Sequence, residues 1–508
     1  MSFLPGMLED RAGLARSAAS TSAGNPRVMR LIRTIACVVG LLWFAPLLGH
    51  VRTTSPDGVG HEWVSMPIRY VVSEGGLPDV LNGSDFRAIH EAFAAWQAVD
   101  SAEVRFEFVG TVPLTAAGKD GINLISFADP VFLETGILAV THNYEEVVDG
   151  QNRIVESDIV LNPNLGFTTS GEPGRYDLQS VMTHQIGHLL GLAESPIVSS
   201  VMSPVSAPGQ VGRRYLGHDD RAGITAIYPD SAPGSATGSI QGSVVLNGQP
   251  VFGAHVVALD GNGTPMVGTL TAPDGSFYLD FLPPGTYRIY AEPMDGPIYA
   301  DQLPVYYESL RTDFATTYYP GTTNLAGAVG VPVSIGATTG PVAIAVGPKT
   351  GSAFNLTVPN FNTSPPKAPP GFISVGRFSV GGVDIVPGSQ FSASTPLVQF
   401  LSPVFSGRLS PTAPTSAHLE SRVHPDTPAG PKNLIGVFGE TMSLISGAFT
   451  VTGPRPEGPS ARPAGSSSTT AVQGSKSSAP RSARRSSGSG TSRTRCAANA
   501  RGSAAECS

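Results

Sequence analysis

The chain changes its sequence pattern abruptly at one short segment, and this change limits the fold classes open to it. Residues 231–238 are rich in Ser, Ala and Gly and have the composition of a flexible linker. Before the linker, residues 51–231 combine strand-like runs with stretches of helical periodicity. After it, short alternating runs are separated by turn sequences such as Asn247-Gly248. We therefore expect a multidomain chain, with an α+β domain followed by all-β domains.

Residue spacing places the helices and strands of the first domain. Apolar residues recur at helical intervals up to Trp96 and predict a helix over residues 85–96, capped by Ser84 or Asp85. Two further helices are predicted over residues 178–190 and 219–228. Alternating apolar residues predict strands over residues 68–72, 104–108, 122–127 and 158–162.

The rest of the chain lacks helical periodicity. The 59 Gly and 45 Pro residues, against only 14% charged residues, favour short strands joined by tight turns. We expect a small β-sandwich over residues 236–350 and a second sandwich over residues 367–453. Residues 454–508 are rich in Ser and Arg and contain almost no large apolar residue, so we expect a disordered tail.

Residues 1–50 have the pattern of an export leader. Positive charges in Met29-Arg-Leu-Ile-Arg33 precede a mostly apolar run over residues 35–49. This run has the length of a signal-peptide core, whereas a membrane-spanning helix needs about 20 residues. A clean Ala-x-Ala cleavage site is missing, so an uncleaved membrane anchor is the alternative. We expect a protein that is secreted or anchored to the cell envelope.

Charge and cysteine content exclude several kinds of site. A net charge of −7 argues against nucleic acid as a partner. The three cysteines, Cys37, Cys496 and Cys507, all lie outside the expected domains. We therefore expect neither a disulfide framework nor a thiolate zinc site in those domains.

One segment, residues 181–195, carries side chains that can bind a metal ion. His184 and His188 are four residues apart on a predicted helix, so both imidazoles project from one face. Gly191 can end the helix and reverse the chain, which would bring Glu194 back as a third ligand. Three protein ligands and a water molecule form the open coordination of a catalytic zinc ion. The alternative for the histidine pair alone is two solvated or structurally paired side chains.

This segment resembles the metzincin signature His-Glu-x-x-His-x-x-Gly-x-x-His, which is followed by a Met-turn. Within that group it is most similar to the matrixins. The similarity extends over about residues 60–230, and Gly136-Ile-Leu-Ala139 lies where matrixins place the edge strand that pairs with substrate. The resemblance implies an α+β metzincin fold and a Zn²⁺ ion bound by His184 and His188. It also implies that Met202, in Ser200-Val-Met-Ser-Pro204, supports the metal site from below.

Two positions depart from the family pattern. Gln185 stands where the family has the glutamate that deprotonates the attacking water. An amide cannot accept that proton, and loss of a general base typically costs about 10²–10⁴ in rate. Glu194 replaces the third histidine. It is a legitimate zinc ligand, but it could instead be a solvated turn residue, or the base if His142 or His218 completed the zinc shell.

The segment after the linker carries a second resemblance. Gly238-Ser-Ile-Gln-Gly-Ser-Val, Asp274-Gly-Ser-Phe277 and Leu282-Pro-Pro-Gly-Thr-Tyr287 are similar to the carboxypeptidase-regulatory-like, prealbumin-type β-sandwich. This module implies a non-catalytic accessory domain that attaches to a surface or substrate, or a simple spacer. Residues 367–453 are similar to immunoglobulin-like modules near His424-Pro-Asp-Thr-Pro-Ala-Gly430.

Three functional hypotheses follow from the first resemblance. The first is an exported zinc metalloendopeptidase with weak peptide hydrolysis, in which Gln185 positions water. The second is a catalytically dead pseudoprotease that binds polypeptide, cell-surface or extracellular matrix material. The third is a scaffold that has lost the metal as well.

Overall fold

The computed structural model describes residues 50–127, 137–204, 206, 208–230, 236–296 and 298–349, together with strands and a few further residues between 356 and 451. The leader expected over residues 1–50 lies, apart from His50, outside the described residues. The tail expected over residues 454–508 also lies outside them.

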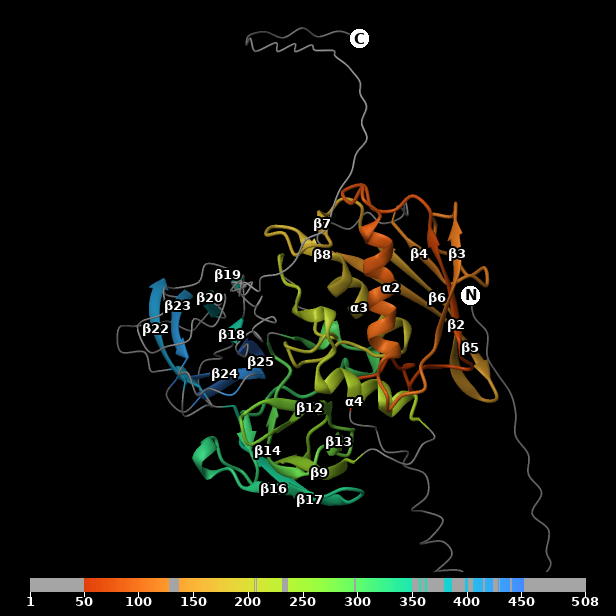
Figure 1. Ribbon diagram of the computed structural model, residues 1–508. Helices are drawn as coiled ribbons and strands as arrows, with labels where there is room; N and C mark the ends of the chain where they lie inside the picture. The colour runs from red at the N-terminus through yellow and green to blue at the C-terminus, as the bar shows by residue number, and fades with distance from the viewer. Residues whose placement is uncertain are drawn as a thin grey trace, which may run out of the picture. The chain divides into compact units, whose positions relative to one another are not determined.

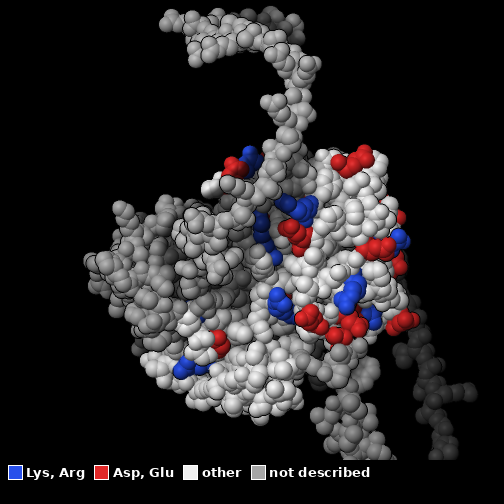
Figure 2. Space-filling model, in the orientation of Figure 1, with Lys and Arg blue, Asp and Glu red and all other residues white. Residues whose placement is uncertain are grey.

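On the face shown in Figure 2, acidic and basic side chains are scattered among uncharged ones, in keeping with the low charge content.

The first domain is built on a six-stranded sheet with the order β1-β6-β4-β2-β3, and β5 pairs with the other edge of β6 (Figure 1). The strands run parallel except β5, which is antiparallel to β6. Among the described strands, β5 pairs only with β6 and forms an edge of the sheet. The strand bounds are β1 Glu62–Trp63, β2 Ile68–Ser73, β3 Phe106–Val112, β4 Leu124–Ser126, β5 Ala139–Val148 and β6 Gln151–Leu161.

The three predicted helices of this domain are confirmed. They are α2 (Ser84–Gln97), α3 (Leu178–Leu189) and α4 (His218–Ile227), accompanied by the short pair β7 (Phe167–Thr168) and β8 (Tyr176–Asp177) and by the 3₁₀ turn η1 (Gly212–Arg214). The helices α2 and α3 contact each other, and α3 also contacts β5 and β6. Trp96 joins the two helices, since its fully buried indole donates a hydrogen bond to the Thr183 carbonyl at 2.7 Å.

The predicted cap of the first helix is wrong. Gly83, with a left-handed φ of 69°, occupies the N-cap, and Ser84 and Asp85 lie inside the first turn. The Asp85 carboxylate accepts the Leu77 amide at 2.9 Å, so it anchors the preceding loop instead of capping the helix. Glycine is favoured here because it adopts this backbone conformation without a Cβ penalty.

Two predicted strands are misplaced in part. The strand expected over residues 104–108 begins at Phe106 and continues to Val112, where most side chains are exposed and give no apolar pattern. The strand expected over residues 158–162 is the end of the longer β6, which pairs with β5 from Gln151 to Leu161. Strands at the edge of a sheet have many solvent-exposed side chains, so an apolar pattern predicts only the part of each strand that is buried.

The second domain is β-rich, as expected. One sheet has the order β10-β9-β13 with β17 on β9, and the other has the order β12-β11-β14-β15 with β16 on β14. Asn247 and Gly248, with φ of 52° and 76°, form the predicted tight turn between β9 and β10. The bounds are β9 Gly238–Leu246, β10 Gln249–Pro250, β11 His255–Leu259, β12 Pro265–Leu270, β13 Ser276–Leu282, β14 Gly285–Glu292, η2 Ala300–Gln302, η3 Val305–Tyr307, β15 Thr317–Tyr318, η4 Leu325–Gly327, β16 Gly330–Val333 and β17 Thr338–Val346.

Strands also occupy the region in which a second sandwich is expected. They form the sheets β18-β20-β23-β22, with β19 on β20, and β21-β24-β25. An immunoglobulin-like sandwich over residues 367–453 stays a prediction. The bounds are β18 Leu356–Thr357, β19 Phe361–Asn362, β20 Ser379–Ile385, β21 Val398–Phe400, β22 Phe405–Ala413, β23 Ser416–Val423, β24 Gly430–Phe438 and β25 Thr441–Val451.

Among the helices described, none combines the length and apolar character required to cross a membrane.

Replacing Trp96 with alanine should strongly destabilise the first domain. The change removes a fully buried indole and its hydrogen bond to Thr183, and comparable truncations cost about 3–5 kcal/mol. We expect a clearly lower unfolding temperature for this domain in scanning calorimetry of the full chain. Leu81→Ala, at a side chain that is 93% exposed, is the control and should leave the transition unchanged. An unchanged transition for Trp96→Ala would contradict this packing.

Candidate metal centre

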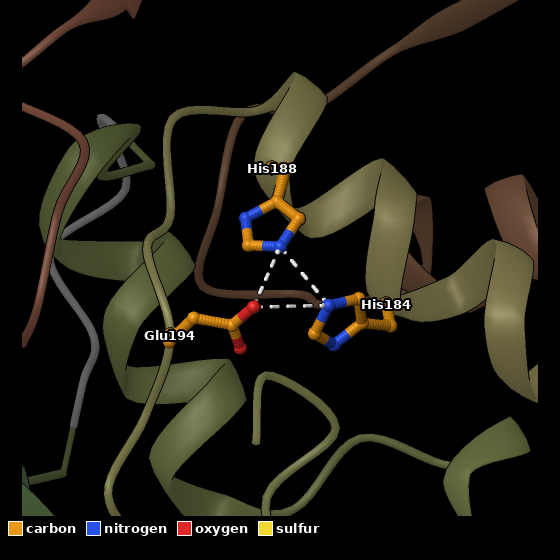
Figure 3. A group of neighbouring side chains, drawn as sticks. All are labelled: His184, His188 and Glu194. Carbon is orange, nitrogen blue, oxygen red and sulfur yellow. Dashed lines mark hydrogen bonds and ion pairs between the residues drawn. The ribbon is translucent and has the colours of Figure 1, made fainter. Parts of the chain in front are cut away.

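Three predicted ligands converge at the end of helix α3. His184 and His188 project from successive turns of the helix, and Glu194 reaches the same point from the loop that follows (Figure 3). The two Nε2 atoms are 3.0 Å apart, and Glu194 Oε1 lies 3.6 Å from His184 Nε2 and 3.4 Å from His188 Nε2. The structure therefore brings together the residues that the sequence predicts as a metal site.

Backbone hydrogen bonds fix both imidazole rings. His184 Nδ1 lies 2.8 Å from the Val201 carbonyl oxygen, and His188 Nδ1 lies 2.9 Å from that of Leu192. Because a carbonyl only accepts, each Nδ1 must carry the proton, and in a neutral ring Nε2 then presents a lone pair. The two lone pairs point at a common position, which is the arrangement of metal-bound histidines with their outer hydrogen bonds in place.

The donor set fits zinc. Tetrahedral Zn²⁺ with bonds of about 2.0–2.1 Å holds its ligand atoms about 3.3 Å apart, close to the 3.0, 3.4 and 3.6 Å observed here. Within the described part of the chain, the buried Oε2 atom of Glu194 has no hydrogen-bond partner. Two imidazoles and one carboxylate are a known zinc-binding set that leaves a fourth position open.

Electrostatics favour a cation beside Glu194. Burial by itself would raise the pKa of the Glu194 carboxyl, but the adjacent imidazoles of His184 and His188 outweigh it and lower this pKa to about 2. Burial likewise opposes a charge on His188, yet the hydrogen bond and charge of Glu194 raise its pKa. The carboxylate is therefore ionised at neutral pH and can offer a charged oxygen to a metal ion.

The turn that places Glu194 beside the histidines depends on Gly191 and on the N-terminal segment, residues 51–61. Gly191 has a φ of +94°, and a Cβ at this position would lie 2.6 Å from the His61 carbonyl oxygen. On either side of this close approach, the Thr53 amide donates to the Gly191 carbonyl at 2.9 Å and the Ala193 amide donates to the Val51 carbonyl at 3.0 Å. A residue with a side chain would force the two segments apart, so glycine is required here.

Met202 lies against helix α3 between the two histidines. A Cβ added to Gly187 would fall 2.1 Å from Met202 Sδ, and Met202 itself is only 2% exposed. The buried Asp220 carboxylate accepts the amides of Val201 and Met202 at 2.9 and 3.1 Å. Met202 therefore packs against α3 at Gly187 and Asp220 holds its turn, whereas its support of the metal site stays a prediction.

Gln185 lies beside the metal centre and is nearly buried, with 6% of its surface exposed. The hydroxyl oxygen of Thr141, on β5, is 2.7 Å from Gln185 Oε1 and 3.1 Å from the Gln185 carbonyl oxygen. With His184 and Glu194, Gln185 lines a cavity of about 290 Å³. Among the described residues that line this cavity, Glu194 is the only carboxylate.

Neither of the two spare histidines reaches the metal centre. Thr141 and Asn143 face helix α3, where Asn143 Nδ2 donates to the His188 carbonyl at 2.8 Å, so His142 between them faces away and is exposed. His218 Nε2 lies 2.9 Å from the Phe281 carbonyl oxygen of the second domain, and burial lowers its pKa. His218 is therefore packed against the second domain and cannot complete the zinc shell.

Sequence reasoning missed the residues that support the ligands from a distance along the chain. Thr141 and Asn143 contact α3 only because β5 lies beside it, and the polar run around them carries no apolar alternation that would predict this contact. Arg213 lines the cavity but has no motif of its own. The only sequence signal for Asp220, which accepts the amides around Met202, is its place at the start of a predicted helix.

Comparison with known proteins identifies the first two domains of the chain. Residues 62–229 match the matrixin family model, and residues 239–295 match the carboxypeptidase regulatory-like domain. The chain is 27% identical to matrix metalloproteinase-16 of Homo sapiens over 36% of this chain and 30% of that protein. It is 28% identical to metalloendoproteinase 1-MMP of Arabidopsis thaliana over 33% of this chain and 44% of that protein. It is 41% identical to metalloendoproteinase 1 of Glycine max over 12% of this chain and 20% of that protein.

The chain thus contains a matrixin domain followed by a carboxypeptidase regulatory-like domain. The matched segments span less than half the length of these relatives. The matrixin match places the first domain among the zinc metallopeptidases, in agreement with the geometry of its metal centre.

Gly191→Ala should weaken folding more than a matched glycine substitution elsewhere. Gly174 also has a positive φ, +82°, but nothing lies within 4 Å of a Cβ built on it. Gly174→Ala therefore measures backbone strain alone, whereas Gly191→Ala adds the clash with His61. We expect an additional loss of about 1–3 kcal/mol in denaturant unfolding of the full chain. Equal losses would show that the contact does not constrain the turn.

The full chain should bind one zinc ion, and His188→Ala should weaken that binding. Mutating a residue that merely hydrogen-bonds a zinc ligand typically lowers zinc affinity by about 10–100-fold. Because His188 is itself a predicted ligand, we expect His188→Ala to lower the affinity at least as much. Chelator competition and calorimetry measure the affinity. His142→Ala removes an exposed imidazole from the neighbouring strand and should leave the affinity unchanged. A zinc affinity that is indifferent to His188→Ala would contradict the assignment.

Proposed function

We propose that the matrixin domain of this chain is an exported zinc metalloendopeptidase domain whose peptide hydrolysis is weak because Gln185 occupies the position of the general base. One observation carries the proposal: His184 Nε2, His188 Nε2 and Glu194 Oε1 converge beside a cavity that Gln185 also lines. No cysteine or additional cofactor is needed, because these three side chains offer a complete set of zinc ligands.

The edge strand β5 supports a polypeptide as the substrate. Among the described strands β5 pairs only with β6, and Ile137, Leu138 and Ala139 at its start line the cavity. An extended chain can add to such an edge through main-chain hydrogen bonds. A polypeptide bound in this way would pass beside the metal centre.

The chemistry available at the site accounts for the weak activity. Zinc, when bound, polarises a water molecule and a substrate carbonyl. Gln185 can orient that water by hydrogen bonding but cannot accept its proton. Glu194 cannot take over this role while its Oε1 atom faces both imidazoles as a ligand, and neither His142 nor His218 lies close enough to replace it.

Export and accessory binding complete the proposal. The charged start and apolar run of residues 29–49 favour secretion or anchoring to the cell envelope. The carboxypeptidase regulatory-like domain would attach the protein to cell-surface or extracellular matrix material, or act as a spacer. Neither role requires catalysis by that domain.

A second candidate function is polypeptide binding without turnover. It is favoured by the position of Gln185, because no other described carboxylate besides Glu194 lines the cavity. In this case the metal centre and edge strand would serve recognition alone. The two candidates differ only in whether the native site turns over a peptide.

The Gln185→Glu variant should cleave peptides faster than the native chain. A carboxylate at this position can accept the Thr141 hydroxyl as the amide oxygen does, and it adds the missing base. We expect kcat/KM to rise by about 10²–10⁴ with a quenched peptide library and zinc. Gln185→Glu combined with His188→Ala is the control and should be inactive.

The native chain decides between the candidates in the same assay. Slow cleavage that a chelator abolishes supports the weak peptidase. Cleavage by the Gln185→Glu variant alone supports the binding function. Zinc-loaded Gln185→Glu protein without any cleavage would contradict the proposal that Gln185 is what limits activity.

A further inference from the structure

The cavity beside the metal centre is lined, among the described residues, by one charged group besides the ligands. Its walls combine apolar residues with hydroxyl groups, and Arg213 contributes a guanidinium. The described lining residues are Ile137, Leu138, Ala139, Tyr176, Ser180, Val181, His184, Gln185, Glu194, Ser203, Pro204, Ser206 and Arg213. Such a cavity can surround the methylene groups of a side chain and present polar partners to its end.

Arg213 is anchored to the loop around Met202. Its Nη1 atom donates to the Ser203 carbonyl at 2.5 Å, and its Nη2 atom donates to the Val198 carbonyl at 3.1 Å. These bonds use two of the five donor hydrogens of the guanidinium. Burial lowers the pKa of Arg213 to about 10, so the side chain stays positively charged at neutral pH.

In the part of the chain that the structure describes, the charge of Arg213 has no direct counter-ion. Among the described residues, no carboxylate oxygen lies within 4.0 Å of its guanidinium, and Asp220 and Glu194 act on it only at longer range. The adjacent Arg214 differs, because its Nε and Nη2 atoms donate to the two oxygens of Asp177 at 2.9 and 2.5 Å. A partly buried cation without a paired anion among the described residues is costly, and an anionic ligand would relieve that cost.

We propose that Arg213 makes this cavity selective for an acidic side chain, Asp or Glu, of the bound polypeptide. The inference rests on the proposed function, since it names the class of polypeptide that the same site accepts. The two carbonyl bonds leave three guanidinium hydrogens of Arg213, which suit a carboxylate, and such charge-assisted bonds are about twice as strong as neutral ones. Among the described residues, Glu194 makes no ion pair with Arg213, because its Oε1 atom faces His184 and His188 and its Oε2 atom has no hydrogen-bond partner.

A peptide-retention experiment with the zinc-loaded full chain tests the inference. The native chain is used, because its weak hydrolysis leaves the bound peptides intact. A positional-scanning peptide library is passed over the immobilised protein, and the retained peptides are sequenced. We expect Asp and Glu to be enriched about tenfold over Asn and Gln at one position, and this enrichment to fall at high salt.

Arg213 variants assign the preference to this residue. Arg213→Gln should abolish the enrichment of acidic residues, whereas Arg213→Lys, which keeps the charge, should retain part of it. Arg87→Gln removes an equal charge from a side chain that is 72% exposed and should change nothing. Zinc stoichiometry is measured for each variant, because Arg213 also holds the loop that carries Met202.

The possible failures are distinguishable. Peptides retained by the native chain without acidic enrichment would overturn the role of Arg213 and leave the proposed function standing. Acidic enrichment that persists in zinc-loaded Arg213→Gln protein would assign the carboxylate to another group and also overturn it. If the zinc-loaded native chain retained no peptide at all, both this inference and the proposed function would fail.

Discussion

Two hydrogen bonds to backbone carbonyls determine the metal centre. Because Val201 and Leu192 accept from Nδ1 of His184 and His188, both Nε2 lone pairs are directed at one point, 3.0 Å from each other. Two lone pairs so close repel unless a cation lies between them, and the Glu194 carboxylate adds a negative charge at the same point. The rest of the domain serves to keep these groups in place.

The loop from Glu194 to Met202 is held from several directions. The N-terminal segment binds the Gly191 turn, and Asp220 accepts the amides around Met202. Asp219 accepts the Ser195 hydroxyl at 2.8 Å and the Gly268 amide of the second domain at 3.0 Å. Beyond Met202, Arg213 holds the carbonyls of Val198 and Ser203. The β-rich domain therefore helps to hold the loop from Glu194 to Met202, through the Gly268 amide and Asp219.

The sequence predicts what depends on local spacing and misses what depends on tertiary contacts. The histidine pair and the left-handed glycine follow from helix geometry, and the helices of the first domain follow from apolar periodicity. The N-cap at Gly83 could not be predicted, because the Asp85 carboxylate accepts the Leu77 amide of the preceding loop instead of capping the helix. Arg213 and Arg214 are neighbours of identical type, and only the fold shows that Arg214 is paired with Asp177 while no described carboxylate pairs with Arg213.

In the matrixin domain of this chain, Gln185 and Glu194 stand where the family resemblance places the general base and the third histidine ligand. The proposed chemistry depends on one zinc ion held by His184, His188 and Glu194. Anomalous diffraction at the zinc edge, from crystals of the zinc-loaded full chain, locates that ion. We expect one strong peak at about 2.0–2.2 Å from His184 Nε2, His188 Nε2 and a Glu194 oxygen. A peak elsewhere, or an imidazole pair joined only by a hydrogen bond in zinc-saturated crystals, would contradict it.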